Sequence, residues 1–215
     1  MLDHILKKLS LTQTKLIAVS KTKPNEAIME LYERGQRHFG ENRVQELITK
    51  YETLPKDIEW HFIGHLQTNK VKYIASFVHC IHSVDSQKIL KEIEKQAAKY
   101  DRSIECLLQF HVAEEASKFG LDLMEAQQLL ENGIGKHQKV KITGVMGMAT
   151  FTHDMQQVRR EFQQLKHLFD SLKESYFKQD ECFKEISMGM SGDFEIAMEE
   201  GSTMVRIGSL LFGKR

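Results

Sequence analysis

A lysine stands where an apolar strand is expected to end. Lys21 directly follows the apolar run from Leu16 to Ser20, within the sequence Ala-Val-Ser-Lys-Thr-Lys-Pro that closes on Pro24. Lysine is rare in protein interiors, and burial lowers the pKa of its amine, so a neutral amine at a dry strand end could attack an aldehyde. The alternative is a lysine with a buried stem and a solvated ammonium group, which is the commoner case for an isolated lysine. Spacing alone does not distinguish Lys21 from Lys23.

Two turns near the end of the sequence carry residues suited to an anion. The first is rich in Gly and Ser, contains Ser191 and precedes an expected helix from Phe194. The second places Gly208 and Ser209 directly after another apolar run. Glycine allows an anion to approach the backbone closely, and free N–H groups at a helix start bind phosphate. Either turn alone could be a helix cap or a tight turn, but together they predict a phosphate site.

Two further polar residues lie at or near strand ends. Arg206 interrupts the apolar run from Met204 to Ile207, and an always-charged guanidinium needs a partner there, which could be a structural ion pair. Asn42 ends the sequence His-Phe-Gly-Glu-Asn, before a helix that contains Val44 and Leu47. We expect Asn42 beside the same site, with helix capping as the alternative interpretation.

A His-Cys-Ile-His sequence at residues 79 to 82 could suggest a metal site. Side chains alternate along a strand, so Cys80 and His82 lie on the face opposite His79, which leaves at most two convergent ligands. We therefore expect no metal site.

Apolar runs and charged stretches with helical spacing alternate along the chain. The runs are residues 16–20, 38–39, 60–63, 80–84, 104–112, 140–146, 183–188 and 204–207, and the charged stretches include 26–34, 86–99, 122–130 and 155–173. Strands buried on both faces between amphipathic helices indicate a parallel sheet, and about eight such units in roughly 250 residues are typical of a (β/α)8 TIM-type barrel. An open doubly wound sheet is the alternative, but the count of eight favours closure.

The predicted barrel gathers the candidate residues. No linker or charge block interrupts the pattern, so we expect residues 1–215 to form a single domain. Functional groups of such barrels collect at the C-terminal ends of the strands, and the loops after the seventh and eighth strands are the recurrent phosphate site. Ser191, Gly208 and Ser209 fall in those two loops.

Composition excludes several function classes. Lys+Arg 30 against Asp+Glu 30 gives a formal net charge of +0, which removes the long-range attraction that a nucleic-acid binder uses. The segment from Met1 to Lys8 is too short for the apolar core of a signal peptide, and no later run could cross a bilayer. Cys80, Cys106 and Cys182 are odd in number and widely spaced, which fits small buried residues in a reducing compartment. We expect a cytoplasmic protein without nucleic-acid or membrane partners.

Several short motifs occur together in a consistent order from about Leu16 to Gly213. They are the sequence around Lys21, Phe-Gly-Glu-Asn at 39–42, Trp-His-Phe-Ile-Gly at 60–64, Leu-Gln-Thr-Asn-Lys at 66–70, Gly-Met-Ser at 189–191, and residues 201–213. On these motifs the sequence resembles the pyridoxal phosphate homeostasis protein family.

The resemblance implies a barrel like the N-terminal domain of alanine racemase, called fold type III, with pyridoxal 5′-phosphate (PLP) held as a Schiff base on Lys21. It implies further PLP contacts: phosphate on Ser191, Gly208 and Ser209, the pyridine nitrogen facing Arg206, and the ring beside Asn42. An arginine at that nitrogen should keep it unprotonated, which weakens the ring as an electron sink. Tight holding with little turnover becomes the expectation.

The function implied by the resemblance is a PLP-binding protein, without catalytic residues, that stores, protects or delivers the cofactor and affects amino-acid and keto-acid balance. We expect a monomer, with apo PLP-dependent enzymes as partners. An amino-acid racemase is the alternative, but it needs two acid/base groups, and Lys21 supplies one; in the similar racemases the other is a tyrosine from a second domain of the partner subunit, absent from this sequence. A phosphate-binding barrel enzyme that uses Lys21 as a general base is a third possibility.

The sequence departs from the family pattern in two places. The segment before Lys21 is short, so we expect an abbreviated N-terminal helix and a less covered barrel floor. His111 stands where an asparagine is expected, near a strand end at the barrel mouth, where it could alter ligand preference.

Overall fold

Eight parallel strands close into a barrel in the computed structural model, which describes residues 2–114, 119–133 and 139–213. The strands are β1 (Lys15–Val19), β2 (His38–Glu41), β3 (Glu59–Phe62), β4 (Cys80–Val84), β5 (Ile104–Gln109), β6 (Val140–Met146), β7 (Glu185–Ser187) and β8 (Met204–Ile207). They pair in chain order, and β1 pairs with β8. The predicted (β/α)8 barrel is confirmed.

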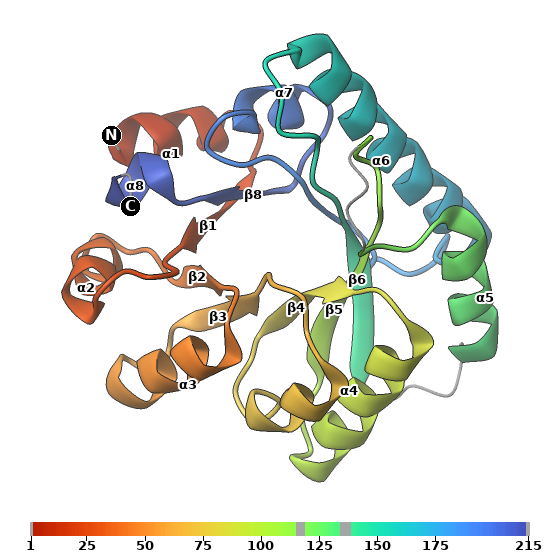
Figure 1. The fold of residues 1–215 in the computed structure, drawn as a ribbon, viewed down its shortest axis with the longest axis horizontal. Coiled ribbons are helices and arrows are strands. Elements are labelled where there is room, and N and C mark those ends of the chain that lie inside the picture. The colour runs from red at the N-terminus through yellow and green to blue at the C-terminus, as the bar shows by residue number, and fades with distance from the viewer. Residues whose placement is uncertain (1, 115–118, 134–138, 214–215) are drawn as a thin grey trace.

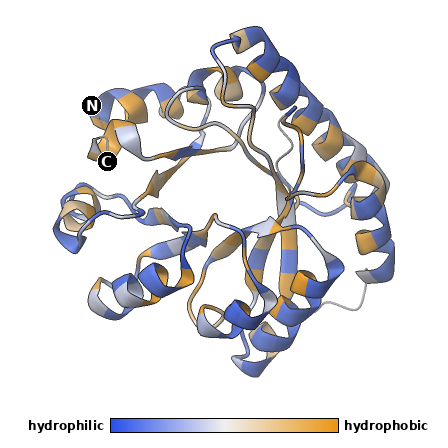
Figure 2. Cartoon of the chain, in the orientation of Figure 1, coloured by the Kyte–Doolittle hydropathy of each residue, from blue (hydrophilic) through white to orange (hydrophobic). Residues whose placement is uncertain are grey.

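Helices surround the strands (Figure 1). They are α1 (Leu2–Ser10), α2 (Asn25–Glu33), α3 (Val44–Thr53), the 3-10 helix η1 (Thr68–Tyr73), α4 (Gln87–Lys99), α5 (Leu123–Gly133), α6 (Met155–Tyr176), α7 (Phe194–Glu199) and α8 (Ser209–Phe212). The expected helical stretches start and end within a few residues of α2, α4, α5 and α6. Hydrophobic and hydrophilic residues alternate around these helices (Figure 2), because one face of each packs on the barrel while the other meets water.

Two apolar layers hold the barrel. Alternate strand residues such as Phe39, Trp60 and Phe62 point outward into the large core shared with the helices. The opposite residues point inward, where a small cluster fills the centre of the barrel: Ile17, Cys80, Leu107, Met146 and Met204. Apolar residues therefore fill much of the interior. We call the two ends of the strands the mouth (C-terminal ends), where the functional groups of such barrels collect, and the floor (N-terminal ends).

The short N-terminal segment still forms a helix that packs. Helix α1 has nine residues, and it buries Leu2, Ile5 and Leu9 in the large core. The register of β1 with β8 runs over four residue pairs, from Lys15 with Met204 to Ala18 with Ile207. The barrel is closed between its first and last strands.

The cysteine prediction was right for two of three residues. Cys80 and Cys106 are buried and unpaired, whereas Cys182 is unpaired and exposed. Cys182 lies in the loop before β7, outside the apolar run, and so has no core to enter. In the described part of the chain, no helix has the length and apolar character needed to span a bilayer.

Candidate functional site

Lys21 lies at the mouth of the barrel. Strand β1 ends at Val19, and the half-buried Lys21 follows two residues later. Ile17 of the same strand points into the barrel interior, and Lys21 lies in the turn that follows the strand. The sequence thus directs this lysine toward the end of the barrel where functional groups gather.

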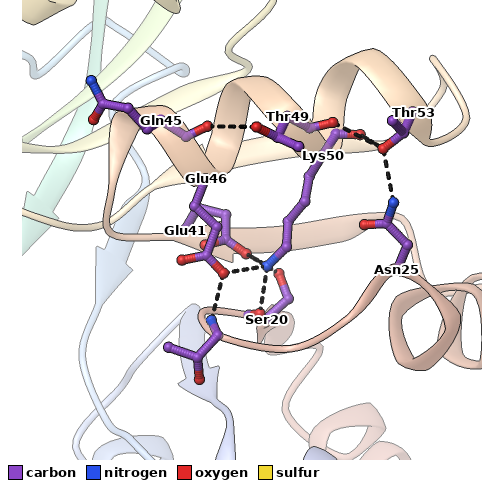
Figure 3. A network of polar contacts seen from close by, with 9 residues as sticks. Ser20, Asn25, Glu41, Gln45, Glu46, Thr49, Lys50 and Thr53 are labelled. Carbon is purple, nitrogen blue, oxygen red and sulfur yellow. Dashed lines mark hydrogen bonds and ion pairs between the residues drawn. The ribbon is translucent and has the colours of Figure 1, made fainter.

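A polar network holds both neighbours of Lys21 (Figure 3). Ser20 Oγ donates to Glu41 Oε1 at 2.6 Å, and the Ser20 carbonyl accepts from Lys50 Nζ at 2.8 Å. The backbone N–H of Thr22 donates to Glu46 Oε1 at 2.5 Å. Thr22 has a φ of 65°, a conformation that residues other than glycine seldom adopt. The network therefore fixes a strained turn and, with it, the backbone from which Lys21 projects.

The centre of this network is a buried ion pair. Lys50 Nζ, on α3, donates to Glu41 Oε1 and to Glu46 Oε1, each at 2.7 Å. The side chains of Lys50 and Glu41 are only 6% and 0% exposed. Burial raises the pKa of the Glu41 carboxyl, while the hydrogen bonds from Lys50 and Ser20 oppose that shift. A carboxylate buried this deeply needs its cation.

The structure separates the two lysines of the Lys-Thr-Lys sequence. Lys23 Nζ donates to the carbonyl of Phe212 at 2.9 Å and to that of Gly213 at 3.3 Å. It is thus directed to the end of α8.

Arg206 donates hydrogen bonds to groups inside the barrel. Its Nη1 donates to the Ser187 carbonyl at 2.8 Å and to Ser187 Oγ at 2.6 Å, and its Nη2 donates to the Gly147 carbonyl at 3.0 Å. Burial lowers the pKa of Arg206 to about 10, and the nearby Asp193 opposes this shift. The guanidinium stays charged at neutral pH, and its position is set by the hydrogen bonds that it donates to Ser187 of β7 and to Gly147 after β6.

The turns after β7 and β8 meet, as the sequence predicts. The backbone N–H of Gly208 donates to Ser191 Oγ at 3.3 Å. Gly208 also lies close to β1, since a Cβ there would be 3.1 Å from the carbonyl oxygen of Val19. Ser209 begins α8 and is exposed. The pairing of Ala18 with Ile207 carries these residues toward Lys21 across the β1–β8 seam.

Asn42 follows β2 at the mouth and is half-buried. Gly64 packs on its backbone, because a Cβ at Gly64 would lie 2.3 Å from the Asn42 carbonyl oxygen. Asn42 also lines a cavity of about 640 Å³ together with residues that include Phe62, His65 and Lys70. The β1–β2 register pairs Val19 with Gly40, and Lys21 and Asn42 each follow two residues later. His111, which follows β5, is exposed.

Sequence reasoning missed the polar residues deeper in the barrel. His61 of β3, His82 of β4 and Ser187 of β7 are all fully buried. As predicted, Cys80 and His82 share a face, but β3 adds His61, and one ligand-capable atom from each of these three residues lies within 4.8 Å of the others. The sequence argument considered one strand alone, so it could not find a neighbour from the next.

Comparisons with known proteins identify the family. The chain matches the alanine racemase N-terminal domain family over residues 2–215. It is 44% identical over 202 residues to the pyridoxal phosphate homeostasis protein of Aquifex aeolicus, covering 94% of this chain and 87% of that protein. The human protein of the same name is 38% identical over 214 residues, covering 94% and 77%. The chain belongs to the pyridoxal phosphate homeostasis protein family.

Solved structures agree with this assignment. This homeostasis-family chain is 36% identical to PipY of Synechococcus elongatus, whose structure has PLP bound; the match covers 94% of this chain and 93% of PipY, with a TM-score of 0.85. An alanine racemase of Clostridium difficile is 13% identical with a TM-score of 0.74, and the match covers 98% of this chain but 55% of the racemase. The likeness to the racemase shows a shared fold only.

Proposed function

We propose that this protein binds PLP at the mouth of its barrel, covalently as a Schiff base with Lys21, and that it stores, protects or delivers the cofactor. Its effect would be on the intracellular balance of amino acids and keto acids. The observation that carries the proposal is the β1–β8 seam, with the turn that holds Lys21 after β1 on one side and the buried Arg206 and the joined Ser191–Gly208 turns on the other. PLP bound to the related PipY supports the choice of ligand.

The donors at the mouth fit a phosphorylated pyridine aldehyde. PLP supplies an electrophilic aldehyde that condenses with an amine, and Lys21 is the amine we assign. Ser191, Gly208 and Ser209 would bind the phosphate through the hydroxyl groups and backbone N–H groups of the two turns. Arg206 can only donate, so it would hold an unprotonated pyridine nitrogen. Asn42 would lie beside the ring.

We further propose that residues 1–215 act as one domain and as a monomer in the cytoplasm, without nucleic-acid, membrane or metal partners. Apo PLP-dependent enzymes are the partners that delivery would require. The balanced charge and the unpaired cysteines support this assignment.

Loss of either anchoring group should weaken PLP retention. Replacing Arg206 or Ser191 with Ala removes charge-assisted or backbone-supported hydrogen bonds, each worth roughly 1.5 to 3 kcal/mol. We expect faster loss of the visible PLP band during dialysis of either variant. Arg159→Ala, which removes ion pairs from α6 to Glu199 and Glu200 on the outside of the barrel, is the control and should retain PLP. Equal retention in all three variants would count against this site.

Racemase activity is the second candidate, because the fold is shared with alanine racemase. We propose that the protein is not an efficient racemase, since Lys21 is one acid/base group where two are needed. A general base contributes about 10² to 10⁴-fold, so with Lys21 as the one acid/base group that we assign, turnover should be slow although PLP binds. Holoprotein mixed with L-alanine should form little D-alanine by chiral chromatography. Lys21-dependent formation at enzyme rates, on the order of 1 to 10³ per second, would restore the racemase interpretation.

A further inference from the structure

A line of hydrogen-bonded polar side chains crosses the barrel from its floor to its mouth. It starts at His38 of β2, whose Nδ1 lies 3.3 Å from His61 Nε2. His61 Nδ1 lies 2.9 Å from His82 Nε2, and His82 Nδ1 lies 3.0 Å from Ser187 Oγ. Ser187 Oγ in turn accepts from Arg206 Nη1 at 2.6 Å. Both nitrogens of His61 and of His82 therefore have a partner within this line.

We propose that His82, with His61 behind it, is a positioning residue for Arg206. The two rings fix the direction of the Ser187 hydroxyl, and this direction presents a lone pair of Ser187 to the guanidinium. The effect of this positioning on PLP retention rests on the proposed function. The direction of the hydrogen bonds is a property of the protein alone and does not depend on it.

The direction can be worked out from the Arg206 end. A guanidinium only donates, so Ser187 Oγ must accept from it. Ser187 is fully buried, and among the described residues the hydrogen bonds of its hydroxyl are with Arg206 Nη1 and His82 Nδ1 alone. The Ser187 hydrogen therefore has an acceptor if His82 Nδ1 carries no proton. His82 then bears its proton on Nε2 and donates to His61 Nδ1. His61 likewise bears its proton on Nε2 and donates to His38.

Burial keeps both inner rings neutral, so each has one proton to place. Desolvation lowers the pKa of His61 well below its usual range, and the neighbouring histidines add to the shift. The pKa of His82 is lowered in the same way, first by burial and then by the charge of Arg206. Apolar neighbours, including Ile17 and Met204, make this a low-dielectric interior in which such bonds are strong.

At the floor end of the line, Glu59 favours the opposite direction of the hydrogen bonds. His38 Nδ1 also lies 3.0 Å from Glu59 Oε2, and His79 Nε2 lies 3.3 Å from the same oxygen. A proton on His38 Nδ1 would satisfy Glu59 and would oppose the proton on His61 Nε2. Glu59 is 41% exposed and can be hydrated instead, whereas the Ser187 hydrogen cannot. The buried end therefore sets the direction.

A metal ion in place of the line is disfavoured by the same atoms. His61, Cys80 and His82 lie close enough to share an ion. However, His61 Nδ1 and His82 Nε2 face each other at hydrogen-bonding distance, so one of them carries a proton. Burial also raises the pKa of Cys80 well above its usual range, and a thiol is a poor metal ligand compared with a thiolate.

The direction can be measured by NMR on PLP-free protein labelled with ¹⁵N-histidine. We expect neutral rings protonated on Nε2 at both His61 and His82 at pH 7. A proton on Nδ1 of either ring would overturn the proposal. In Ser187→Ala, which removes the group that sets the direction, the tautomer of His61 should change although Ser187 does not touch it. Cys80→Ala, on the same interior face, should leave both tautomers unaltered; an unaltered His61 in Ser187→Ala would contradict the coupling.

The positioning role is tested by PLP retention. His82→Phe keeps an aromatic ring but removes both nitrogens, and the rate of PLP loss should rise roughly three- to tenfold, the effect of about one hydrogen bond. His82→Gln, which keeps an acceptor for Ser187, should recover part of the retention, and Cys80→Ala should retain PLP fully. Unchanged retention in His82→Phe overturns the positioning role. Unchanged retention in Arg206→Ala would instead reject the proposed PLP site. The NMR test of the His61 and His82 tautomers does not depend on that outcome.

Discussion

Borohydride should fix PLP irreversibly to Lys21 and to no other lysine. The imine carbon of a Schiff base is electrophilic, so hydride addition turns a reversible bond into a stable secondary amine. Holoprotein should lose its visible absorption on reduction. Peptide mass mapping should then find the reduced cofactor on the peptide that contains Lys21.

The matched control for this experiment lies two residues away. Lys21→Ala should carry no covalent cofactor, whereas Lys23→Ala should be labelled like the unaltered protein, because the ammonium group of Lys23 is bound to the carbonyls of Phe212 and Gly213. A label found on Lys23 would reject the assignment of the amine. Absence of a label in the unaltered protein would reject the covalent link.

Lys50→Met should be the most destabilising single change near the site. It leaves the fully buried Glu41 carboxylate without its cation, and breaking a buried pair in this way costs about 3–5 kcal/mol. The measurement is the free energy of unfolding from urea titrations. Glu41→Leu combined with Lys50→Met should recover much of the loss, because no charge is left buried. A loss below about 1 kcal/mol for Lys50→Met is the size expected of a solvated surface pair and would contradict the prediction.

The pH dependence of that loss has a definite sign. Lys50 holds the pKa of Glu41 down against the upward effect of burial, so its removal should raise the pKa of Glu41 further. A carboxyl with a raised folded-state pKa favours folding when it is protonated, and that stability is lost as the pH rises through the folded pKa. The stability difference between Lys50→Met and the unaltered protein should therefore be smaller at acidic pH than at neutral pH.

The sequence predicted the framework of the site because each strand is short and buried. Strands β4, β6 and β8 have the predicted bounds, since apolar runs end where the chain leaves the barrel. The expectation that the buried Arg206 needs hydrogen-bond partners is confirmed. Its partners are backbone carbonyls and a serine, however, and a single strand gives no means of identifying them.

Contacts between strands and with helices could not be predicted in the same way. Lys50 looks like an ordinary helix lysine, and only the packing of α3 on β2 brings it to Glu41. His61 and His82 meet because β3 and β4 are neighbours with a particular register. The contact of Lys23 with Phe212 likewise depends on where α8 ends. Each of these contacts joins different elements of the fold, over 9 residues for Lys50 and Glu41, 21 for His61 and His82, and 189 for Lys23 and Phe212.

Because the proposed site spans the seam between β1 and β8, binding of PLP would favour closure of the barrel during folding. The strands that pair there are the first and last of the barrel, and joining residues so distant in the chain is a slow, non-local step. Lys21 lies on one side of the seam, and Arg206 and Gly208 lie on the other. A chain whose last strand has not docked would have only half of the proposed site. By mass action, PLP would then draw the open barrel toward the closed one, and the supply of cofactor would help to determine how much of the protein is assembled.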